Sequence, residues 1–508
     1  MKRSKAAGDE AFELGGKTSL GDVVDVASGF RPVRLSPQAR AKVAAARRTL
    51  LKAASGGKAV YGVNTGFGEL ASKRIPADKL AQLQRNLVLS HACGVGAPLT
   101  EEESRAILFL RANELSRGFS GIRPEVIDVM TTLVNAGASP VIPSRGSVGA
   151  SGDLAPQAHM ALLLLGQGEA WWEGERVSGD ELLEELDLKP VALEAKEGLA
   201  LLNGTQAMQA VGAFALHRAR FVFEAAQLAG ALSLEAMTGT PVPFDEPVQR
   251  LKPHPGQIKA AAQLRALLKG SAIRESHRDN DPRVQDPYSL RCMPQVHGAV
   301  LDVLDRSDSV VETELASVTD NPLVVDGRVI SGGNFHGQAL SFAFDSAAAA
   351  LTALGNISER RTFQLISGQA PGLKPFLASD PGVESGWMIA QVAAAALASE
   401  NKALAHPASA DSVPTSANKE DFVSMGMGAA LKLKQVVWNA AQIVAIELLC
   451  AAEGVEVHAP LAPGKGAAEG LRRLRLKEAR CRGDEILGPR MEAVRELILS
   501  GYFAGVVG

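Results

Sequence analysis

The stretch "VGASGD", residues 148–153, places three small residues directly before a carboxylate. In a tight bend, the amide nitrogen of Gly152 can attack the carbonyl carbon of Ala150, because glycine has no Cβ to oppose the bend. Loss of water from Ser151 then leaves an exocyclic methylene on a five-membered ring. Such a ring is a strong electrophile, which the ordinary side chains do not supply. The stretch is therefore either the precursor of a self-made electrophile or a simple turn before a helix.

Motifs of other common chemistries do not occur in the chain. Ser147 and Ser151 do not lie in G-x-S-x-G, and neither H-E-x-x-H nor G-x-x-x-x-G-K-[ST] is found. The nine histidines do not cluster at metal-ligand spacing, so no metal site is expected. The net charge of −3, from 53 Lys and Arg against 56 Asp and Glu, gives no reason to expect nucleic acid or an anionic membrane as a partner.

Several features favour a cytoplasmic location. The first residues, "MKRSKAAGDEAFELGG", are basic but contain no apolar stretch of the kind a secretory signal needs. The most apolar segment begins at Val436 and is interrupted by Asn439, Gln442 and Glu447, which predicts a buried helix and not a membrane span. The four cysteines lie far apart and predict reduced thiols: Cys93, Cys292, Cys450 and Cys481.

Composition and periodicity predict an all-α, or mainly α, protein. Alanine is abundant and aromatic residues make up only 5% of the chain, which favours long and closely packed helices. A helix is expected after Ser36, with Pro37 at its first position. Helical patterns also occupy residues 196–239, 290–316, 335–366, 383–405, 426–452 and 467–499.

These patterns suggest three parts of the chain. Residues 1–20 are expected to be a flexible N-terminus. Residues 21–205 would form a smaller N-terminal domain that carries the "VGASGD" stretch. Residues 206–508 would form an elongated central bundle of long helices and a C-terminal helical region. Exposed apolar faces of such a bundle would be natural oligomer interfaces.

Further motifs follow one another in a fixed order between about residues 59 and 428. They are "AVYGVNTGFG", "NLVLSHACGVG", "SRGSVGASGDLAPQAHMA", "LLNGTQA", "VQDPYSLRCMPQVHGA", "TDNPL", "GGNFHGQ", "SGWMIAQVAAAALASENKALAHPAS" and "PTSANKEDFVSMG". With them the chain resembles the histidine and aromatic amino acid ammonia-lyases, which carry a 4-methylidene-imidazol-5-one (MIO) group. The resemblance implies an MIO formed autocatalytically from Ala150, Ser151 and Gly152, with no external cofactor. It also implies an amino acid substrate and a homotetramer whose active sites are shared between subunits.

The resemblance assigns roles to residues around the ring. Tyr61, in a glycine-rich segment that would form a lid, is implied to be the base that takes the β-proton. Asn203 and Tyr288 are implied to support the MIO and the substrate, and Phe335 to pack beside the ring. Asp153 is implied to assist cyclisation; from its position alone, it would cap the helix that follows.

One face of the "VQDPYSLR" motif could bind a carboxylate. Gln285, Tyr288 and Arg291 follow one another at steps of three, so a helix or tight turn would place them on roughly one face. The planar guanidinium of Arg291 matches a carboxylate bidentately, and the resemblance implies that it binds that of the substrate. Without the resemblance, this face could equally be plain solvated surface.

The pair Ser90-His91 bears on the choice of substrate. Histidine-specific members of the resembled family carry Ser-His at this place, which favours an imidazole. His91 and Glu420 could hydrogen-bond the two ring nitrogens, and Met388 would flank the ring. The expected reaction is the non-oxidative deamination of L-histidine to trans-urocanate and ammonia.

The motif around Glu420 departs from the usual pattern. Histidine-specific members typically read "NQEDHVSM", whereas this chain has Lys419 for Gln and Phe422 for His. A lyase acting on tyrosine or phenylalanine therefore stays open, as does an aromatic amino acid 2,3-aminomutase with the same MIO. A helical scaffold without activity would explain the helices but not the set of motifs.

Overall fold

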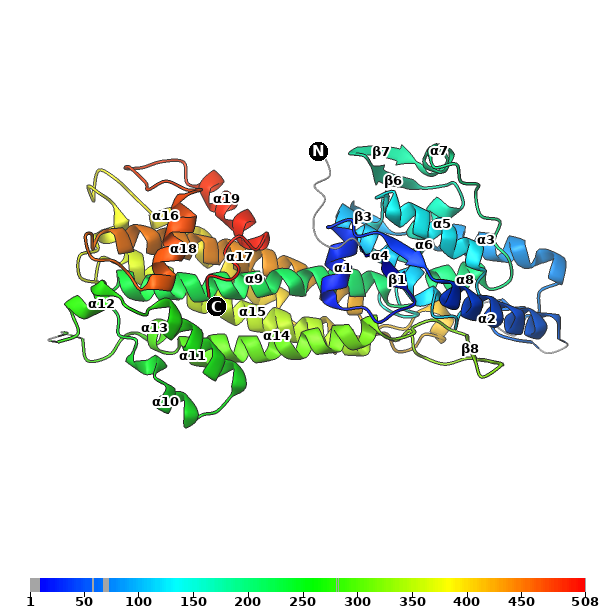
Figure 1. Ribbon diagram of the computed structural model, residues 1–508, viewed down its shortest axis with the longest axis horizontal. Coiled ribbons are helices and arrows are strands. Elements are labelled where there is room, and N and C mark those ends of the chain that lie inside the picture. Colours follow the sequence, from blue (N-terminus) through cyan, green and yellow to red (C-terminus); the bar gives the residue numbers. More distant parts are fainter. Residues whose placement is uncertain (1–9, 57–58, 67–72, 280, 282, 508) are drawn as a thin grey trace. The chain divides into compact units, whose positions relative to one another are not determined.

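The computed structural model describes residues 10–56, 59–66, 73–279, 281 and 283–507 (Figure 1). The chain divides into two compact units. Unit 1 consists of Met1–Phe214, Asp308–Phe344 and Pro407–Leu431, and unit 2 of Ala215–Ser307, Asp345–His406 and Lys432–Gly508. Of the N-terminus predicted to be flexible, residues 1–9 lie outside the described residues, and Phe12–Leu14 forms strand β1.

Several helices of unit 1 begin at polar caps. Ser36 accepts a hydrogen bond from the Ala39 N–H and Pro37 stands at the first position, as predicted. Thr100 and Glu103 form a reciprocal capping box at the start of α4. The helices wholly within unit 1 are α1 (Leu20–Ala27), α2 (Pro37–Ser55), α3 (Leu80–His91), α4 (Glu101–Leu115), α5 (Pro124–Asn135), α6 (Leu154–Leu164), α7 (Gly179–Glu185) and α8 (Glu197–Leu202).

Short strands connect these helices. The parallel pair β1 and β2 (Val33–Leu35) aligns Phe12 with Val33, and the antiparallel pair β3 (Val95–Pro98) and β5 (Pro143–Arg145) aligns Val95 with Arg145. The other strands form one three-stranded antiparallel sheet and one hairpin. They are β4 (Ser139–Pro140), β6 (Glu169–Trp172) and β7 (Glu175–Ser178), then β8 (Leu323–Val325) and β9 (Arg328–Ile330).

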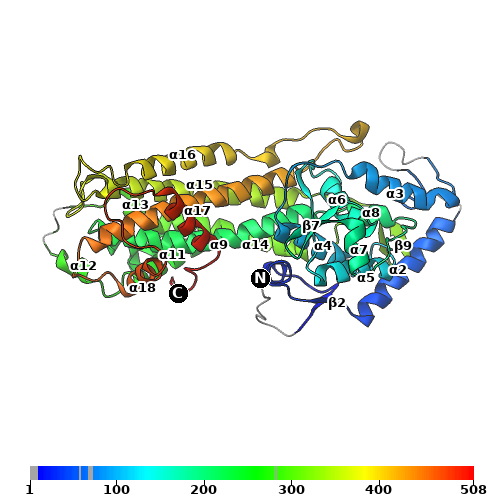
Figure 2. The same cartoon turned by 90° about the horizontal axis from the view of Figure 1, so that it is seen from above.

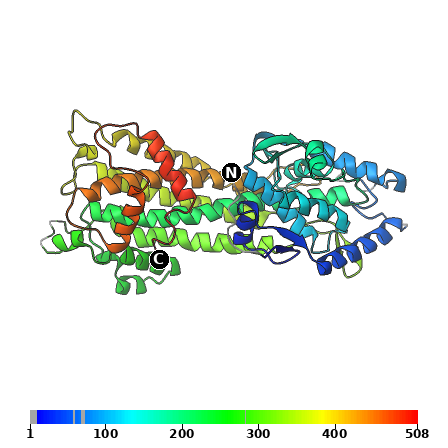
Figure 3. The same cartoon turned by 45° about the horizontal axis from the view of Figure 1, so that its top comes forward.

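Four long helices run side by side in unit 2 (Figures 2 and 3). They are α9 (Gln206–Ala236), α14 (Met293–Leu315), α15 (Gln338–Ile366) and α17 (Gly426–Glu456). One end of each of these four helices belongs to unit 1. The buried carboxylate of Glu447 on α17 accepts hydrogen bonds from Ser233, Ser358 and Arg361, which lie on α9 and α15. The other helices are α10 (Glu246–Arg250), α11 (Pro255–Leu267), α12 (Ala272–Ser276), α13 (Tyr288–Arg291), α16 (Met388–Leu404), α18 (Lys465–Arg475) and α19 (Gly488–Leu499).

Three of the predicted helical patterns are interrupted. The pattern at 290–316 breaks at Cys292, between α13 and α14. The pattern at 196–239 breaks at Asn203 and Gly204, between α8 and α9. Gly204 has φ of +144°, and a Cβ there would lie 2.5 Å from Gln206 Oε1 and 2.7 Å from an Arg111 nitrogen, so the break occurs where glycine alone fits. The pattern at 467–499 breaks between α18 and α19. The prediction of one continuous helix is wrong at all three places, because apolar periodicity does not report a local turn.

The prediction of a mainly α-helical fold is confirmed. Across the described part of the chain, no strand exceeds four residues. All four cysteines are free, as predicted. Helices α15 and α17 are long and apolar enough to cross a membrane by length and composition, but 61% and 89% of their most apolar windows are buried. Core helices have the same composition, and burial on this scale is what the sequence predicts for the segment around Val436.

Candidate active site

The loop between β5 and α6 carries the predicted ring precursor. Gly149 and Gly152 both have φ of +71°, which residues with a side chain rarely adopt. A Cβ on Gly152 would lie 2.1 Å from the Gly204 carbonyl oxygen, and a Cβ on Gly149 would lie 2.2 Å from Ser424 Oγ. Glycine alone fits at both positions, and the chain bends tightly around Ala150 and Ser151 between them.

Two distant segments of unit 1 hold this loop. On one side, the Asp153 N–H donates to the Gly204 carbonyl at 2.8 Å. On the other side, the Met425 N–H donates to the Val148 carbonyl at 2.9 Å, and the Ser424 hydroxyl donates to the Gly149 carbonyl at 3.1 Å. The loop is therefore fixed from both sides, by the break before α9 and by the segment that leads into α17.

Ser151 is the centre of a group of hydrogen-bonded residues, the Ser151 cluster. It includes Asn203, Glu420 and the hydroxyl residues that bond to Glu420 or to the precursor loop. The hydroxyl of Ser151 donates a hydrogen bond of 2.7 Å to Oε1 of Glu420, and its carbonyl accepts one of 3.0 Å from Nδ2 of Asn203. The three side chains come from three segments that are far apart in the sequence. The structure thus brings together three of the residues singled out from the sequence.

Asn203 is buried and has one side-chain acceptor without a hydrogen-bond partner among the described residues. It is only 3% exposed, and its own carbonyl accepts a hydrogen bond of 2.8 Å from the fully buried guanidinium of Arg111. Among the described residues, its side-chain Oδ1 has no hydrogen-bond partner. A buried acceptor without a partner is uncommon in a protein interior, and this one belongs to a side chain that bonds to the Ser151 carbonyl.

Asp153 stands at the predicted position just before α6, but its side chain does not cap that helix. The buried carboxylate accepts hydrogen bonds from the Met208 N–H in the first turn of α9, at 2.8 Å, and from the Ser147 hydroxyl, at 2.7 Å. The suggested capping of α6 is therefore wrong, because the carboxylate points toward the free amides of another helix. Burial raises the pKa of Asp153 to about 6, against the lowering effect of these hydrogen bonds.

This raised pKa predicts a pH-dependent stability term. The folded state holds the proton of Asp153 up to about pH 6, whereas the unfolded chain releases it near 3.8. The stabilisation is complete below the unfolded value and is lost as the pH rises through about 6, a change of about 3 kcal/mol. Asp153→Asn removes this titration. Urea unfolding of both proteins between pH 4 and 7 should show the variant gaining on the wild type as the pH rises, and a constant difference would contradict the assignment.

Glu420 lies in a dense set of hydroxyls. Its Oε2 accepts hydrogen bonds from Thr415 Oγ1 at 2.7 Å and from Ser416 Oγ at 2.8 Å, while Oε1 accepts the one from Ser151. Burial would raise the pKa of Glu420, but these three hydrogen bonds and the nearby His91 together lower it below its ordinary value. Glu420 is therefore a carboxylate at neutral pH.

His91 is the last residue of α3 and lies near Glu420. Its Nδ1 is 3.0 Å from Ser90 Oγ. Burial lowers the pKa of His91, opposed by the Leu87 carbonyl and by the charge of Glu420. A neutral imidazole is both a donor and an acceptor, so His91 and Glu420 together offer complementary polar groups.

Three other residues of unit 1 bear on the site. Tyr61 lies half-buried in a turn; the last two residues of its glycine-rich motif, 67 and 68, lie outside the described residues. Phe335 is half-buried and precedes His336, whose ring stacks on that of Phe422 at 5.9 Å between centroids. Phe422 itself is 61% exposed, so much of its ring remains open to solvent.

The remaining predicted residues belong to unit 2. Tyr288 and Arg291 form the two ends of α13, and the guanidinium lies 4.4 Å from the centre of the Tyr288 ring. Gln285 precedes this helix and is exposed, and Met388 begins α16. Within the part of the chain that is described, the buried Nε of Arg291 has no hydrogen-bond partner. This guanidinium retains donor capacity for an anion.

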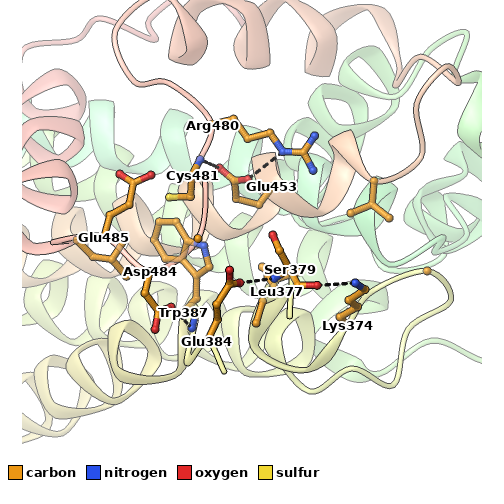
Figure 4. Close-up of a pocket in the computed structure, with 16 residues that line it drawn as sticks. Lys374, Leu377, Ser379, Glu384, Trp387, Glu453, Arg480, Cys481, Asp484 and Glu485 are labelled. Carbon is orange, nitrogen blue, oxygen red and sulfur yellow. Dashed lines mark hydrogen bonds and ion pairs between the residues drawn. The ribbon is translucent and has the colours of Figure 1, made fainter. Parts of the chain in front are cut away.

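A cavity of about 220 Å³ lies next to Met388 along the chain, where Trp387 lines it (Figure 4). Its carboxylates already have partners: Glu384 accepts from the backbone N–H groups of Ser379 and Asp380, and Asp484 accepts from those of Ser385 and Gly386. Burial raises the pKa of the lining Cys481 to about 11, so this thiol is not a ready nucleophile. The cavity lies in unit 2, whereas Ser151, Asn203 and Glu420 belong to unit 1.

Several residues of the cluster were not anticipated from the sequence. Their signal was present, since hydroxyls precede Glu420 in "PTSANKE" and Ser147 and Ser424 belong to quoted motifs, but spacing did not reveal their partners. They are Ser147, Thr415, Ser416 and Ser424.

Known proteins are similar to this chain in both fold and sequence. A family model for aromatic amino acid lyases matches residues 18–476. Histidine ammonia-lyase of Anaeromyxobacter sp. (strain K) is 51% identical over 503 residues, covering 97% of this chain and 99% of the relative. The crystal structure of histidine ammonia-lyase from Trypanosoma cruzi is 40% identical with a TM-score of 0.90, and covers 98% of this chain and 95% of that one. Tyrosine aminomutase from Streptomyces globisporus is 34% identical with a TM-score of 0.91, and covers 98% of both chains.

The matched range spans most of the chain. The chain belongs to the aromatic amino acid lyase family. It is accordingly a carbon–nitrogen lyase, as the sequence predicts.

Proposed function

We propose that the chain catalyses the non-oxidative deamination of L-histidine to trans-urocanate and ammonia. The observation that carries this proposal is the position of Glu420, which is hydrogen-bonded to the Ser151 hydroxyl and lies close to His91. This arrangement offers a charged acceptor and a second polar group to a ring beside the precursor loop. The relatives named histidine ammonia-lyase, at about half identity over nearly the full length, support the same substrate.

We infer that Ala150, Ser151 and Gly152 cyclise autocatalytically to an MIO, with no external cofactor and no metal. The residues present fit such a group. Close approach of backbone to Gly152 demands glycine at the attacking position, and the free Oδ1 of Asn203 is available to a modified Ser151. Once formed, the ring supplies an electrophilic methylene that makes the substrate amino group a better leaving group. Asp153, which accepts from the Ser147 hydroxyl beside the loop, would assist its formation.

Recognition of the imidazole follows from hydrogen-bond complementarity. A neutral imidazole has one N–H donor and one acceptor nitrogen. The Glu420 carboxylate would accept from the N–H, and His91 would pair with the other nitrogen. Met388 would flank the ring. A phenylalanine ring would leave both polar groups without partners in a site that excludes water, which is unfavourable.

The remaining residues would act on the amino acid part of the substrate. Arg291 would bind the carboxylate through two parallel N–H groups, supported by Gln285. The Tyr61 phenolate would take the β-proton, whereupon the bond from Cα to nitrogen breaks and the α,β-unsaturated acid and ammonia leave. Asn203 and Tyr288 would support the reacting groups, and Phe335 would pack beside them.

The proposal includes an assembly and a location. A homotetramer with active sites built from more than one subunit would bring Gln285, Tyr288, Arg291 and Met388 to the Ser151 cluster. Tetramers of this kind are a property of the resembled family. The cytoplasm is the proposed location, with the small amino acid as the partner and neither nucleic acid nor membrane involved.

One alternative has its own supporting observation. Phe422, stacked on His336, stands two residues after Glu420 where histidine-specific members of the family carry a histidine, so an apolar ring takes the place of a polar one. This favours a more apolar site, and the chain is also similar to a tyrosine aminomutase. The alternative is therefore a lyase or a 2,3-aminomutase that acts on tyrosine or phenylalanine.

Replacing His91 tests the choice of substrate. Wild type and His91→Leu are each incubated with histidine, tyrosine and phenylalanine, and the products are identified by chromatography. The wild type should prefer histidine and form urocanate. In His91→Leu, kcat/KM for histidine should fall about tenfold or more relative to kcat/KM for the other two, because a polar partner of the imidazole is lost.

The control is His254→Leu, which changes an exposed histidine of unit 2 and should leave the ranking of substrates as in the wild type. If the wild type prefers tyrosine or phenylalanine, the proposal that histidine is the substrate is wrong. A β-amino acid product would identify an aminomutase. An unchanged ranking in His91→Leu would remove His91 from the ring pocket.

A further inference from the structure

The segment that carries Glu420 has an unusual backbone. Three consecutive residues, none of them glycine, have backbone angles in the left-handed region: Ser416 with φ of +49°, Ala417 with +52° and Asn418 with +67°. Residues with a Cβ pay a free-energy penalty there, so the conformation persists only where surrounding contacts enforce it. The turn is closed by two backbone hydrogen bonds between Thr415 and Glu420, of 2.9 Å and 3.4 Å. Strain of this kind concentrates at functional sites.

The turn divides the two oxygens of Glu420 between different partners. It brings the hydroxyls of Thr415 and Ser416 to the same oxygen, Oε2, at 2.7 Å and 2.8 Å. The other oxygen, Oε1, accepts from Ser151 at 2.7 Å. The terminal torsion of a glutamate is broad and weakly restricted by itself. Two hydroxyls on one oxygen therefore fix an orientation that the side chain would not hold alone.

Formation of the proposed ring changes this balance. The hydroxyl of Ser151 leaves as water, so Oε1 loses that hydrogen bond, while Oε2 keeps both of its partners. Oε1 is then a charged acceptor directed at the place where Ser151 stood.

We propose that Thr415 and Ser416 are positioning residues, which hold Glu420 so that its Oε1 accepts the imidazole N–H of the substrate. This inference rests on the proposed function and adds to it the residues that determine the geometry of substrate recognition. Neither hydroxyl is required to touch the substrate. Their effect is transmitted through the orientation and ionisation of Glu420.

The same hydroxyls keep Glu420 ionised. Among the described residues, the titratable group that acts on this carboxylate from another element is His91 at the end of α3, and Lys419 and Asp421 flank it along the chain. Asp153 lies two residues beyond Ser151 in the precursor loop and bonds to Ser147 and Met208. Removal of the Thr415 hydroxyl leaves these groups in place. A change in the acidic limb of the pH profile would then report the hydroxyl itself.

The decisive comparison is Thr415→Val against Thr415→Ser. Valine keeps the branched shape and removes the hydroxyl, and serine restores the hydroxyl. We expect Thr415→Val to lower kcat/KM for histidine at least about tenfold and to move the acidic limb toward higher pH, with Thr415→Ser close to the wild type. The intact mass of each variant should show the loss of two water molecules, which separates substrate positioning from ring formation. Ser412→Ala is the matched control, because this hydroxyl on the same segment bonds the Val423 N–H and not Glu420.

Ser416→Gly provides an independent test should Thr415→Val fail to fold or to form the ring. Glycine relieves the left-handed backbone and removes the second hydroxyl, so the variant is expected to be at least as stable as the wild type and yet several-fold weaker in kcat/KM. Wild-type kinetics and an unshifted pH profile in the folded variants would overturn the positioning role. A wild type that does not turn over histidine would overturn the proposed function instead, and this inference with it.

Discussion

Ser151→Ala is expected to yield a folded protein that does not lose two water molecules from its chain and has almost no activity. Alanine fits the half-buried loop, since the tight bend is enforced at Gly149 and Gly152 and not at Ser151. Without a hydroxyl, however, no water can leave from this residue and no methylene can form. We expect kcat/KM to fall at least about a thousandfold, as when a reacting group is removed from other enzymes.

Intact-mass measurement decides this case. The wild type should be lighter than its sequence by two water molecules, whereas Ser151→Ala should not show both losses. Ser55→Ala, at the exposed end of α2, is the control and should match the wild type in mass deficit and rate. An active wild type with the complete unmodified mass would refute the self-made electrophile. High activity in Ser151→Ala would do the same.

Arg291→Lys is expected to have the second largest effect. The guanidinium of Arg291 lies over the Tyr288 ring, 4.4 Å from its centre, and its buried Nε has no hydrogen-bond partner among the described residues. Lysine keeps the charge but loses both the stacking plane and the two parallel N–H groups that match a carboxylate. We expect kcat/KM for histidine to fall about thirtyfold or more, which corresponds to about 2 kcal/mol.

Steady-state kinetics test this prediction alongside intact mass. The variant should still lose two water molecules, because Arg291 acts on the substrate and not on the ring. The control Arg278→Lys changes an arginine of the same unit that pairs with Glu275 at the surface, where exchange of one cation for another has little effect. A near-wild-type kcat/KM in Arg291→Lys would mean that the arginine serves the structure of unit 2.

The sequence was sufficient to predict those features that depend only on neighbouring residues. The cap at Ser36 and Pro37, the start of α6 after Asp153 and the mainly helical fold all follow from propensity and periodicity over a few residues. These features could be predicted without knowing how the chain folds. The cyclisation of Ala150, Ser151 and Gly152 also rests on adjacent residues, but it remains a prediction.

Other features depend on contacts between distant segments and could not be predicted. Asp153 sits where a cap for α6 is expected, yet its carboxylate bonds to the Met208 N–H of α9. The helical pattern that contains Asn203 gives no sign of the break that places this side chain on the Ser151 carbonyl. Likewise, no propensity favours a left-handed turn at residues 416–418, because tertiary contacts override the local preference.

The buried carboxylate of Glu447 has a consequence for how the long helices of unit 2 align. Their facing surfaces are rich in alanine and leucine, and such surfaces fit together in several registers that differ by one helical turn. A slip of one turn would carry Glu447 away from Arg361 and leave two charges buried without partners, a penalty of about 3 to 5 kcal/mol. Apolar packing supplies the cohesion between α9, α15 and α17, and the buried polar cross-link at Glu447 favours one alignment over others that are nearly equal in packing.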